Sequence, residues 1–418
     1  MKNYKKVVLA FLLLFLFLNN INATNEPNIY SKYAILEDFE SGSILYQKNI
    51  DQKLYPASTT KILTTITAIE NADLNKIVVA DPETLKLLPP YSSNAAIKPY
   101  EALTLKELLQ TLLVVSGNDS ALIIADAVSG DIPTFVNLMN ETAKKIGCTN
   151  THFANPHGYH DENHYTTARD MMKILRYGLQ YKEFKELISI KELKIPATNT
   201  TPERHYLNTN RMFFKPEEIG HLAHFYPYNK GGKTGFTNEA LRTFVGYAEK
   251  DGRTLLTGVF YIKNVNGRDG KFIDAENLYN YGFNNFSKQT LINKDTHVIS
   301  VIDKYHKKDY LLKENFEQLL PNNNNFIKKY KFNITNLENN TFIEVNQDSS
   351  TGVYNISINS TNLEVNPYLY CIRSNNDQNN FIKNLKERIE INIYNLKYKL
   401  KRWTICSPFI ILRNLSKY

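Results

Sequence analysis

Two stretches of alternating apolar and polar residues frame the first two thirds of the chain. Residues 33–39 (YAILEDF) and 43–49 (SILYQKN) alternate on either side of Glu40-Ser41-Gly42, which predicts a β-hairpin. Residues 241–263 alternate in the same way around Lys250-Asp251-Gly252-Arg253. They predict a second hairpin, long enough to lie in the middle of a sheet.

Helical periodicity dominates between these hairpins. The pattern is helical from Ser58 to about Asp126, and Thr104-Leu105-Lys106-Glu107 forms a capping box before LLQTLLVV. Further helices are predicted over 132–146, from Thr166 onward, and over about 271–284. The last of these is expected to close a first domain that begins at residue 24.

The composition changes after residue 285. Short strand-like runs are separated by Asn, Asp and Gly, which predicts a small all-β domain over 286–378. These runs are THVISVI (296–302), YKFNIT (330–335), FIEVN (342–346) and VYNISIN (353–359).

The N-terminus has the layout of a secretory signal peptide. Three lysines precede a twelve-residue apolar run, residues 7–18, and a small residue, Ala23, follows it. An uncleaved membrane anchor is the alternative, but the run is shorter than the ~20 residues that a spanning helix needs. We therefore expect residues 1–23 to be removed and the protein to be exported.

The C-terminal segment, residues 379–418, predicts a basic amphipathic helix. Its apolar positions recur in steps of three and four with lysines and arginines between them: Leu385, Ile389, Ile393, Leu396, Leu400 and Trp403. Such a helix would attach the protein peripherally to the outer face of the cytoplasmic membrane. The alternative is a helix packed on the protein itself.

The net charge of +8 over 418 residues resides at the two ends of the chain. Residues 381–418 carry nine basic and two acidic residues, so the body is nearly neutral and no nucleic-acid surface is predicted. The three cysteines are far apart and form no CxxC or Cys/His cluster. We therefore predict no disulfide framework, no metal and no cofactor.

The first candidate for chemistry is Ser58-Thr59-Thr60-Lys61. Residues i and i+3 share a helix face, so Lys61 would lie close to the hydroxyl of Ser58. A lysine can act as a base only when its amine is neutral, and burial and a second cation such as Lys233 both lower a lysine pKa. The alternative is that Ser58 simply caps a helix.

The second candidate, Ser116-Gly117-Asn118, falls between two apolar helical segments. Ser116 could relay a proton to a leaving group, and the amide of Asn118 could bind the substrate. All three residues are also common in turns, so a plain turn is the alternative.

The third candidate is Lys233-Thr234-Gly235, which opens a strand region after Gly231-Gly232. Lys and Thr on one strand point to opposite faces unless the strand is distorted, and glycine allows a ligand to approach the backbone. A lysine and a hydroxyl beside an exposed strand edge suit a carboxylate, and the edge can bind an extended peptide.

The order of these motifs is that of the penicillin-recognising serine enzymes. Around them, residues 36–64, 148–171 and 231–237, with the hairpin at 250–261, resemble the D-alanyl-D-alanine carboxypeptidases, the low-molecular-weight penicillin-binding proteins. The resemblance covers about residues 30–285. It implies a β-lactamase/transpeptidase-like fold, a mainly antiparallel sheet flanked by helices, and more weakly that family's β-rich second domain after it.

The resemblance also implies roles for the motif residues. Ser58 would attack the penultimate D-Ala carbonyl of peptidoglycan stem peptides, and Lys61 would take its proton. The backbone N–H groups of Ser58 and Phe236 would hold the oxyanion. Ser116 would pass a proton to the departing D-Ala, and Lys233 and Thr234 would bind its carboxylate. β-Lactam antibiotics would acylate the same serine.

Two further residues match family positions near the site. Arg268 would support carboxylate binding, with a surface salt bridge as the alternative. His157 would border the site, with a turn histidine as the alternative. The chain departs from the family at Phe236, where His or Tyr is common, and at Thr209, where some members carry arginine; whether Arg211 compensates is open.

Two other functions compete with a carboxypeptidase. A class A β-lactamase would carry Ser-Asp-Asn and a glutamate that activates water, whereas this chain has Gly117, and Glu162 does not stand in the expected motif. A penicillin sensor or scaffold would keep Ser58 and acylate it without useful peptide hydrolysis, but no transmembrane signalling segment is visible between residues 24 and 380.

Overall fold

The computed structural model describes residues 26–294 and, beyond them, a set of shorter segments. These segments are 297–302, 307–312, 315–322, 330–336, 344–347, 354–359 and 363–366. The chain divides into two compact units, Met1–Phe286 and Ser287–Tyr418. The predicted signal peptide and basic tail lie outside the described residues.

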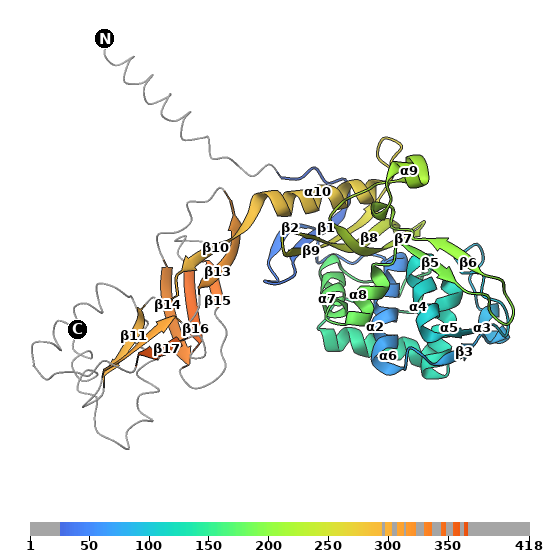
Figure 1. Cartoon of the computed structure of the whole chain (residues 1–418), viewed down its shortest axis with the longest axis horizontal. Coiled ribbons are helices and arrows are strands. Elements are labelled where there is room, and N and C mark those ends of the chain that lie inside the picture. Colours follow the sequence, from blue (N-terminus) through green and yellow to red (C-terminus); the bar gives the residue numbers. More distant parts are fainter. Residues whose placement is uncertain are drawn as a thin grey trace, which may run out of the picture. The chain divides into compact units, whose positions relative to one another are not determined.

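A five-stranded antiparallel sheet forms the centre of the first unit (Figure 1). Its order is β2 (Ile44–Lys48), β1 (Tyr33–Asp38), β9 (Arg253–Ile262), β8 (Leu241–Lys250) and β7 (Asn229–Thr237). Both predicted hairpins are confirmed, and the second does lie inside the sheet. Strand β7 is left at an edge.

Helices cover both faces of this sheet (Figure 1). Helix α10 (Gly270–Asn285) packs on one face. Helix α7 (Ala168–Gly178) packs on the other face and joins a larger helical layer. That layer contains α2 (Lys61–Asn71), α4 (Leu105–Val114), α5 (Asn118–Ser129), α6 (Ile132–Ile146) and α8 (Lys182–Ile188).

The alternation in β1 explains the two cores. Ile35 belongs to the apolar core on the helical-layer side, and Leu36 belongs to the core beneath α10. Both side chains are fully buried. A strand covered on both faces must be apolar at successive positions, and YAIL is.

Several helix boundaries follow the predicted signals. The Thr104 hydroxyl and the Glu107 carboxylate form the expected reciprocal capping box at the start of α4. Helix α6 spans 132–146 as predicted. The side chain of Thr167 caps α7 by accepting the N–H of Asp170.

The prediction of continuous helical structure from Ser58 to Asp126 is wrong in its middle. Helix α2 ends at Asn71, and two short strands, β3 (Ile77–Val79) and β4 (Ala102–Thr104), pair with each other. Between them lie α3 (Pro82–Lys86) and a loop that contains Pro89-Pro90 and Pro99. Proline has no N–H to donate and keeps this loop out of helix.

The rest of the first unit consists of short elements. They are η1 (Ala57–Thr60), β5 (Glu192–Ile195), β6 (Arg204–Leu207), η2 (Arg211–Phe213), α9 (Pro216–Ile219) and η3 (Gly220–Leu222). Within the described residues, no single helix is long and apolar enough to cross a membrane. Helices α5 and α6 together would be long and apolar enough, but the pair is bent by 87°.

The described part of the second unit consists of strands. A three-stranded antiparallel sheet contains β11 (His297–Ile302), β12 (Lys307–Leu312) and β17 (Leu363–Asn366). A second contains β14 (Tyr330–Asn336), β16 (Tyr354–Asn359) and β15 (Glu344–Gln347), with β14 and β16 parallel. A further pair contains β10 (Phe286–Ile292) and β13 (Phe316–Pro321). Strands therefore occur in all four predicted runs.

Candidate active site

Ser58 lies inside a short 3₁₀ turn that leads into α2. The alternative, that Ser58 simply caps this helix, does not hold: Pro56 occupies the N-cap of the turn and Thr60 that of α2, and neither end has a side-chain cap. The preceding residue, Ala57, has φ 49°, a conformation that non-glycine residues adopt rarely. The Ser58 hydroxyl is therefore not used in capping, and it lies 3.1 Å from Nζ of Lys61.

Lys61 is completely buried and has three polar neighbours. Its Nζ lies 2.6 Å from Oδ1 of Asn118 and 2.7 Å from the carbonyl oxygen of His157, in addition to the Ser58 hydroxyl. Burial, and then the positive charge of Lys233, hold the pKa of Lys61 well below its usual value. The base expected from the sequence thus has both expected causes of a neutral amine.

Ser116-Gly117-Asn118 joins α4 to α5, as predicted. Ser116 is 6% exposed and has φ 64°, and its carbonyl accepts a hydrogen bond of 2.8 Å from the hydroxyl of Ser93. The backbone N–H of Asn118 donates to the carbonyl of Ser93 at 2.8 Å. The structure therefore brings the side chain of Asn118 to Lys61, with Ser116 in the turn two residues earlier.

Lys233 lies on β7 opposite Val245, and Thr234 lies opposite Phe244. Val245 belongs to the core on the helical-layer side and Phe244 to the core beneath α10, so the two motif side chains keep to opposite faces. Lys233 is fully buried; burial, and then the charge of Lys271, lower its pKa to about 7. Its Nζ donates to the carbonyl of Thr234 at 2.8 Å.

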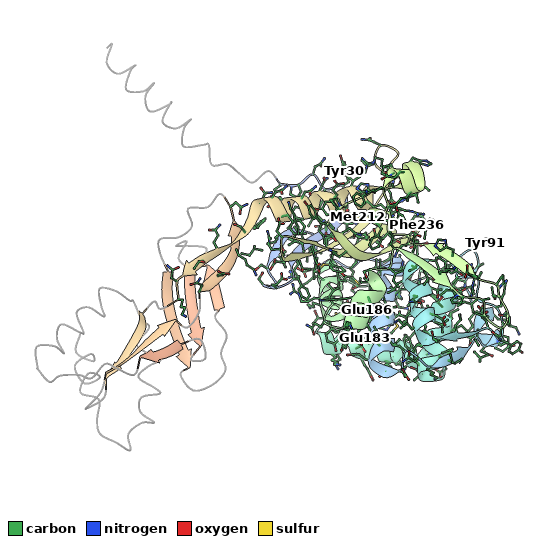
Figure 2. All side chains as sticks on the ribbon, in the orientation of Figure 1. Tyr30, Tyr91, Glu183, Glu186, Met212 and Phe236 are labelled. Atoms are coloured by element: carbon green, nitrogen blue, oxygen red, sulfur yellow. The ribbon has the colours of Figure 1, made fainter. Side chains whose placement is uncertain are left out.

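The next three residues of β7, Thr234, Gly235 and Phe236, have different surroundings. The hydroxyl of Thr234 donates to the hydroxyl of Thr209 at 2.8 Å, a contact that the sequence did not indicate. A Cβ at Gly235 would lie 2.9 Å from the backbone nitrogen of Ser58, so glycine lets β7 approach the serine. Phe236 is 55% exposed (Figure 2). The guanidinium of Arg242 lies over its ring.

His157 reaches the site through its backbone, since its carbonyl oxygen accepts from Lys61. Its ring is buried, and Nδ1 accepts the N–H of Tyr159 at 3.1 Å. Burial, followed by the charges of Lys61 and His164, lowers the pKa of His157 to about 3. The ring is therefore neutral near pH 7.

Arg268 does not make the surface salt bridge that was the alternative reading. Its Nη2 donates to Nδ1 of His224 at 3.2 Å, and none of the ion pairs found within the described residues involves it. The guanidinium of Arg211 lies 6.0 Å from the ring centroid of Phe214, and its positive charge is among the causes that lower the pKa of Lys271, after burial.

His164 supports the site and was missed from the sequence. Its Nδ1 accepts the N–H of Ala154 at 3.1 Å, so Nε2 carries the proton and donates to the Thr60 hydroxyl at 2.7 Å. Burial holds the pKa of His164 at about 3. This bond ties the segment around His157 to the residue before Lys61. A histidine in a polar loop sequence carries no signal of such a contact.

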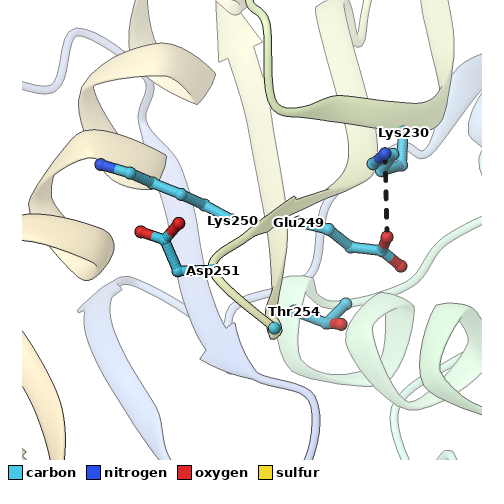
Figure 3. A pocket seen from close by; sticks show the side chains of 6 residues that line it. Lys230, Glu249, Lys250, Asp251 and Thr254 are labelled. Atoms are coloured by element: carbon cyan, nitrogen blue, oxygen red, sulfur yellow. Dashed lines mark ion pairs between the residues drawn. The ribbon is translucent and has the colours of Figure 1, made fainter.

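A shallow concavity at the β8–β9 turn contains none of the predicted site residues (Figure 3). It is lined by Lys230, Glu249, Lys250, Asp251, Gly252 and Thr254. Lys230 and Glu249 form an ion pair of 4.0 Å across it.

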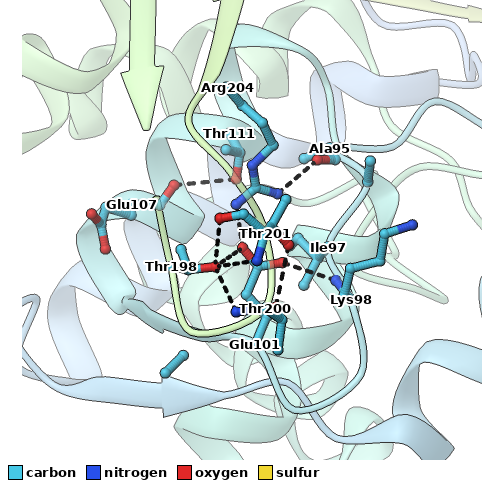
Figure 4. Close-up of polar contacts among 12 residues, drawn as sticks. Ala95, Ile97, Lys98, Glu101, Glu107, Thr111, Thr198, Thr200, Thr201 and Arg204 are labelled. Carbon is cyan, nitrogen blue, oxygen red and sulfur yellow. Dashed lines mark hydrogen bonds and ion pairs between the residues drawn. The ribbon is translucent and has the colours of Figure 1, made fainter. Parts of the chain in front are cut away.

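The loop before α4 is anchored by a buried ion pair (Figure 4). Arg204 of β6 pairs with Glu101, whose side chain is 0% exposed, and also donates to the carbonyl of Ala95. Asp119 accepts the N–H groups of Ala95 and Ile97. The loop that holds Ser93 against Ser116 is thereby fixed from two sides.

A serine beside a buried lysine with a depressed pKa, on a sheet whose edge strand carries Lys-Thr-Gly, defines the class: a serine hydrolase of the penicillin-recognising type. A sequence model of the D-alanyl-D-alanine carboxypeptidase family, peptidase family S11, matches residues 20–264. The chain belongs to this family of serine-type carboxypeptidases.

Individual relatives agree. The chain is 30% identical to the D-alanyl-D-alanine carboxypeptidase DacF of Bacillus subtilis over 290 residues, which cover 69% of this chain and 71% of DacF. It is 32% identical to DacB2 of Mycobacterium tuberculosis over 251 residues, or 60% of this chain and 81% of DacB2.

Solved structures extend the agreement to the fold. A D-alanyl-D-alanine carboxypeptidase from Mycobacterium tuberculosis superimposes with a TM-score of 0.55 and 31% identity, covering 62% of this chain and 92% of that one. A point mutant of the DD-transpeptidase of Streptomyces K15 gives a TM-score of 0.56 and 25% identity over 62% of this chain and all of that one. The β-lactamase/transpeptidase-like fold predicted from the sequence is confirmed.

Proposed function

We propose that this protein removes the terminal D-Ala from peptidoglycan stem pentapeptides through an acyl-enzyme on Ser58. The observation that carries the proposal is the set of three contacts around the buried amine of Lys61. The carbonyl oxygens of Asn118 and His157 can only accept hydrogen bonds. A neutral amine has two hydrogens for these acceptors, and its lone pair then faces the Ser58 hydroxyl.

Acylation follows from this arrangement. Lys61 takes the proton of Ser58 as Oγ bonds to the penultimate D-Ala carbonyl carbon, and the backbone N–H groups of Ser58 and Phe236 hold the oxyanion. The proton passes from Lys61 through Ser116 to the nitrogen of the terminal D-Ala as the C–N bond breaks. Water then attacks the ester, and its proton returns by way of Lys61 to Ser58.

Lys233 and Thr234 bind the carboxylate of the departing D-Ala, with Arg268 in support. A carboxylate near Lys233 stabilises the protonated amine, which offsets the lowering of its pKa by burial. Gly235 contributes the close approach of β7 to Ser58. β-Lactams carry a carboxylate and a strained amide, so they acylate Ser58 in the same geometry.

The details of the site argue against a class A β-lactamase. A Cβ at position 117 would lie 2.5 Å from Oγ of Ser120 and 2.8 Å from Oδ1 of Asp119, so the Ser-Asp-Asn sequence does not fit this turn. Glu162 is exposed and makes no hydrogen bond or ion pair found within the described residues. We therefore expect acylation by penicillin with slow release.

The chain ends complete the proposal. Residues 1–23 direct export and are removed, 24–285 form the catalytic domain, 286–378 form a β-rich domain, and 379–418 attach the enzyme to the outer face of the cytoplasmic membrane. Sedimentation with membranes tests the attachment. Mature full-length protein is expected to pellet and a chain ending at Cys371 to stay in the supernatant; pelleting of both would overturn the anchor.

The catalytic proposal is tested with diacetyl-Lys-D-Ala-D-Ala and a fluorescent penicillin. We expect D-Ala release and stable labelling by the wild type, and neither by Ser58→Ala. Lys61→Ala should retain the fold and lose acylation by at least about 10³-fold, because the serine lacks its base. Lys53→Ala, a change at an exposed lysine on the segment before Ser58, is the matched control and should behave as wild type.

Three results would contradict the proposal. Rapid penicillin hydrolysis without D-Ala release would indicate a lactamase. Stable labelling without D-Ala release would indicate a sensor. Retention of D-Ala release by Ser58→Ala would mean that another residue is the nucleophile.

A further inference from the structure

The guanidinium of Arg268 is held by a histidine from the segment between η3 and β7. Nη2 of Arg268 donates to Nδ1 of His224 at 3.2 Å, and Nε2 of His224 lies 2.8 Å from Oε2 of Glu276. A guanidinium can only donate, so Nδ1 must be an acceptor and the ring proton must reside on Nε2, where it bonds to Glu276. The contact with Arg268 therefore requires a neutral imidazole.

This chain of three side chains is built into the fold. His224 is 6% exposed, and its backbone N–H donates to the carbonyl of Arg211 at 3.1 Å. Its ring packs on Phe272 of α10, with centroids 5.8 Å apart. Arg268 is itself fixed by paired backbone hydrogen bonds of 2.9 Å with Val265.

The same packing leads to the Lys-Thr-Gly strand. Phe272 contacts Phe244, with centroids 5.7 Å apart, and Phe244 is the cross-strand partner of Thr234. Lys271, next to Phe272 in α10, is close enough for its charge to lower the pKa of Lys233. The first turn of α10, the residues before it and the proposed carboxylate-binding strand thus belong to one assembly.

A neutral acceptor has a particular consequence for Arg268. A carboxylate partner would neutralise the guanidinium, whereas a neutral imidazole orients it and leaves its full positive charge for a ligand. The carboxylate of Glu276 lies on the other side of the ring, at Nε2 of His224, where it fixes the tautomer of the ring.

We propose that His224, oriented by Glu276, is a positioning residue that holds Arg268 ready for the terminal carboxylate of the substrate and releases it when the imidazole is protonated. The proposal rests on the proposed carboxypeptidase function and deepens it. Protonation of Nδ1 replaces the acceptor with a donor and sets two cations against each other. The contribution of Arg268 to recognition of the carboxylate should therefore weaken in acid.

Polar and charged groups from several packed elements surround the ring of His224. Arg268 faces Nδ1 from the turn before α10, and Glu276 faces Nε2 from α10. Nζ of Lys271 lies over the ring of Phe272, the residue that packs on His224, and forms an ion pair with Asp269. Arg211 contributes its backbone carbonyl from η2. Among the side-chain types in this cluster, imidazole is the one that serves as a charge switch near physiological pH.

The experiment compares two substrates, diacetyl-Lys-D-Ala-D-Ala and the same peptide with a C-terminal amide. The ratio of their kcat/KM values measures carboxylate recognition, and effects of pH on Lys61 cancel in it. The charge of Lys233, whose pKa is about 7, cancels when the wild-type ratio is divided by that of a His224 variant at the same pH. His224→Phe keeps the ring packing but loses both hydrogen bonds, so at pH 8 the ratio should fall on the order of tenfold below that of the wild type. His224→Gln can accept from Arg268 and donate to Glu276, so it should restore the ratio.

The pH profile separates positioning from a merely structural role. The wild-type ratio divided by the His224→Gln ratio should fall as the pH is lowered from 8 to 5, because only the wild type loses the acceptor for Arg268 in acid. The gain of a proton by Lys233 is common to both proteins and cancels. His221→Phe, a change at an exposed histidine three residues earlier, is the matched control and should keep the wild-type profile.

The proposal is overturned if His224→Phe and the wild type have the same ratio at pH 8, or if the wild-type ratio divided by the His224→Gln ratio is the same at pH 5 as at pH 8. These outcomes are distinct from failure of the proposed function, which would appear in the wild type itself as no D-Ala release or as release that survives Ser58→Ala. Thermal unfolding of each variant shows whether a lost ratio reflects a lost fold; the His224→Gln profile tests the proposal in either case.

Discussion

Gly158 lies directly against the backbone of Ala57, the residue before the proposed nucleophile. A Cβ at position 158 would come within 1.9 Å of the Ala57 carbonyl oxygen and 2.9 Å of the Thr60 hydroxyl. Gly158 also has φ +83°, and Ala57 has φ 49°. Two unusual backbone conformations are therefore pressed together where Ser58 is presented, and the neighbouring carbonyl of His157 holds Lys61.

Gly158→Ala is expected to disrupt both the fold and the site. The positive φ and the backbone clash together should lower the free energy of unfolding by more than about 2 kcal/mol. Acylation by penicillin should slow by at least about tenfold, because the His157 carbonyl must move away from Lys61. Chemical denaturation and fluorescent penicillin labelling measure the two effects.

Gly147→Ala supplies the control for this prediction. Gly147 has φ +89°, but nothing lies within 4 Å of the position of its Cβ. Its substitution should cost about 1 kcal/mol from backbone strain alone and leave acylation unchanged. Equal effects of the two substitutions would show that the contact with Ala57 does not matter.

The alkaline limb of activity should depend on Lys271. Lys233 binds a carboxylate in its protonated form, and its pKa is lowered to about 7 by burial and by the charge of Lys271. The binding form is present below that pKa and is lost as the pH rises through it. Lys271→Met removes one of the two causes, so the fall of kcat/KM for diacetyl-Lys-D-Ala-D-Ala should move to higher pH.

Asp269 keeps a partner in that variant, because Nε of Arg242 lies 3.6 Å from its Oδ1. Lys250→Met, which removes a half-buried lysine at the β8–β9 turn, is the charge-matched control and should leave the profile in place. An unmoved alkaline limb in Lys271→Met would mean that Lys233 does not set it.

Gly117→Asp should not turn the enzyme into a lactamase. The substitution creates the Ser-Asp-Asn sequence, but its Cβ would meet Oγ of Ser120 at 2.5 Å and distort the turn that presents Asn118 to Lys61. We expect penicillin acylation to fall by at least about tenfold with no gain in hydrolysis. In Gly117→Ala, the further change Ser120→Ala should recover part of the acylation rate, since it removes the nearest clashing atom.

The sequence predicts those parts of the site that depend on local order. Ser58 and Lys61 are three residues apart on a helical turn, and Lys233 and Thr234 lie on one strand, so their relations follow from periodicity. The capping box at Thr104 and the two hairpins are predictable for the same reason. Whether Ser58 caps the helix could not be decided from the sequence, because a serine at a helix start has the same local signature whether or not its hydroxyl turns back to the backbone.

Contacts between distant segments could not be predicted from the pattern. Strand β1 pairs with β9, more than 200 residues away, and nothing in YAILED specifies that partner. Thr209 against Thr234 and His224 against Arg268 are likewise products of the tertiary fold. Gly158 shows the same limit, since in the sequence it resembles any turn glycine, and only packing shows that it lies on Ala57.

The buried ion pair between Arg204 and Glu101 should be among the most sensitive supports of the site. Arg204→Met leaves a carboxylate that is 0% exposed without its cation, and an uncompensated buried charge costs about 3 to 5 kcal/mol. The loss also frees the loop that holds Ser93 against Ser116, so penicillin acylation should slow along with it. Lys86→Met, which breaks a pair whose side chains are 69% and 74% exposed, should change the free energy of unfolding by less than about 1 kcal/mol.

The double variant Arg204→Met/Glu101→Gln tests the cause. If the unpaired charge is responsible, removing it should recover at least about half of the lost stability, while the missing hydrogen bond to the Ala95 carbonyl keeps acylation slow. A double variant as unstable as Arg204→Met would instead assign the loss to packing of the arginine stem. Urea denaturation and the acylation rate, measured on the same samples, distinguish the two explanations. Only the charge explanation predicts a double variant that regains stability while its acylation stays slow.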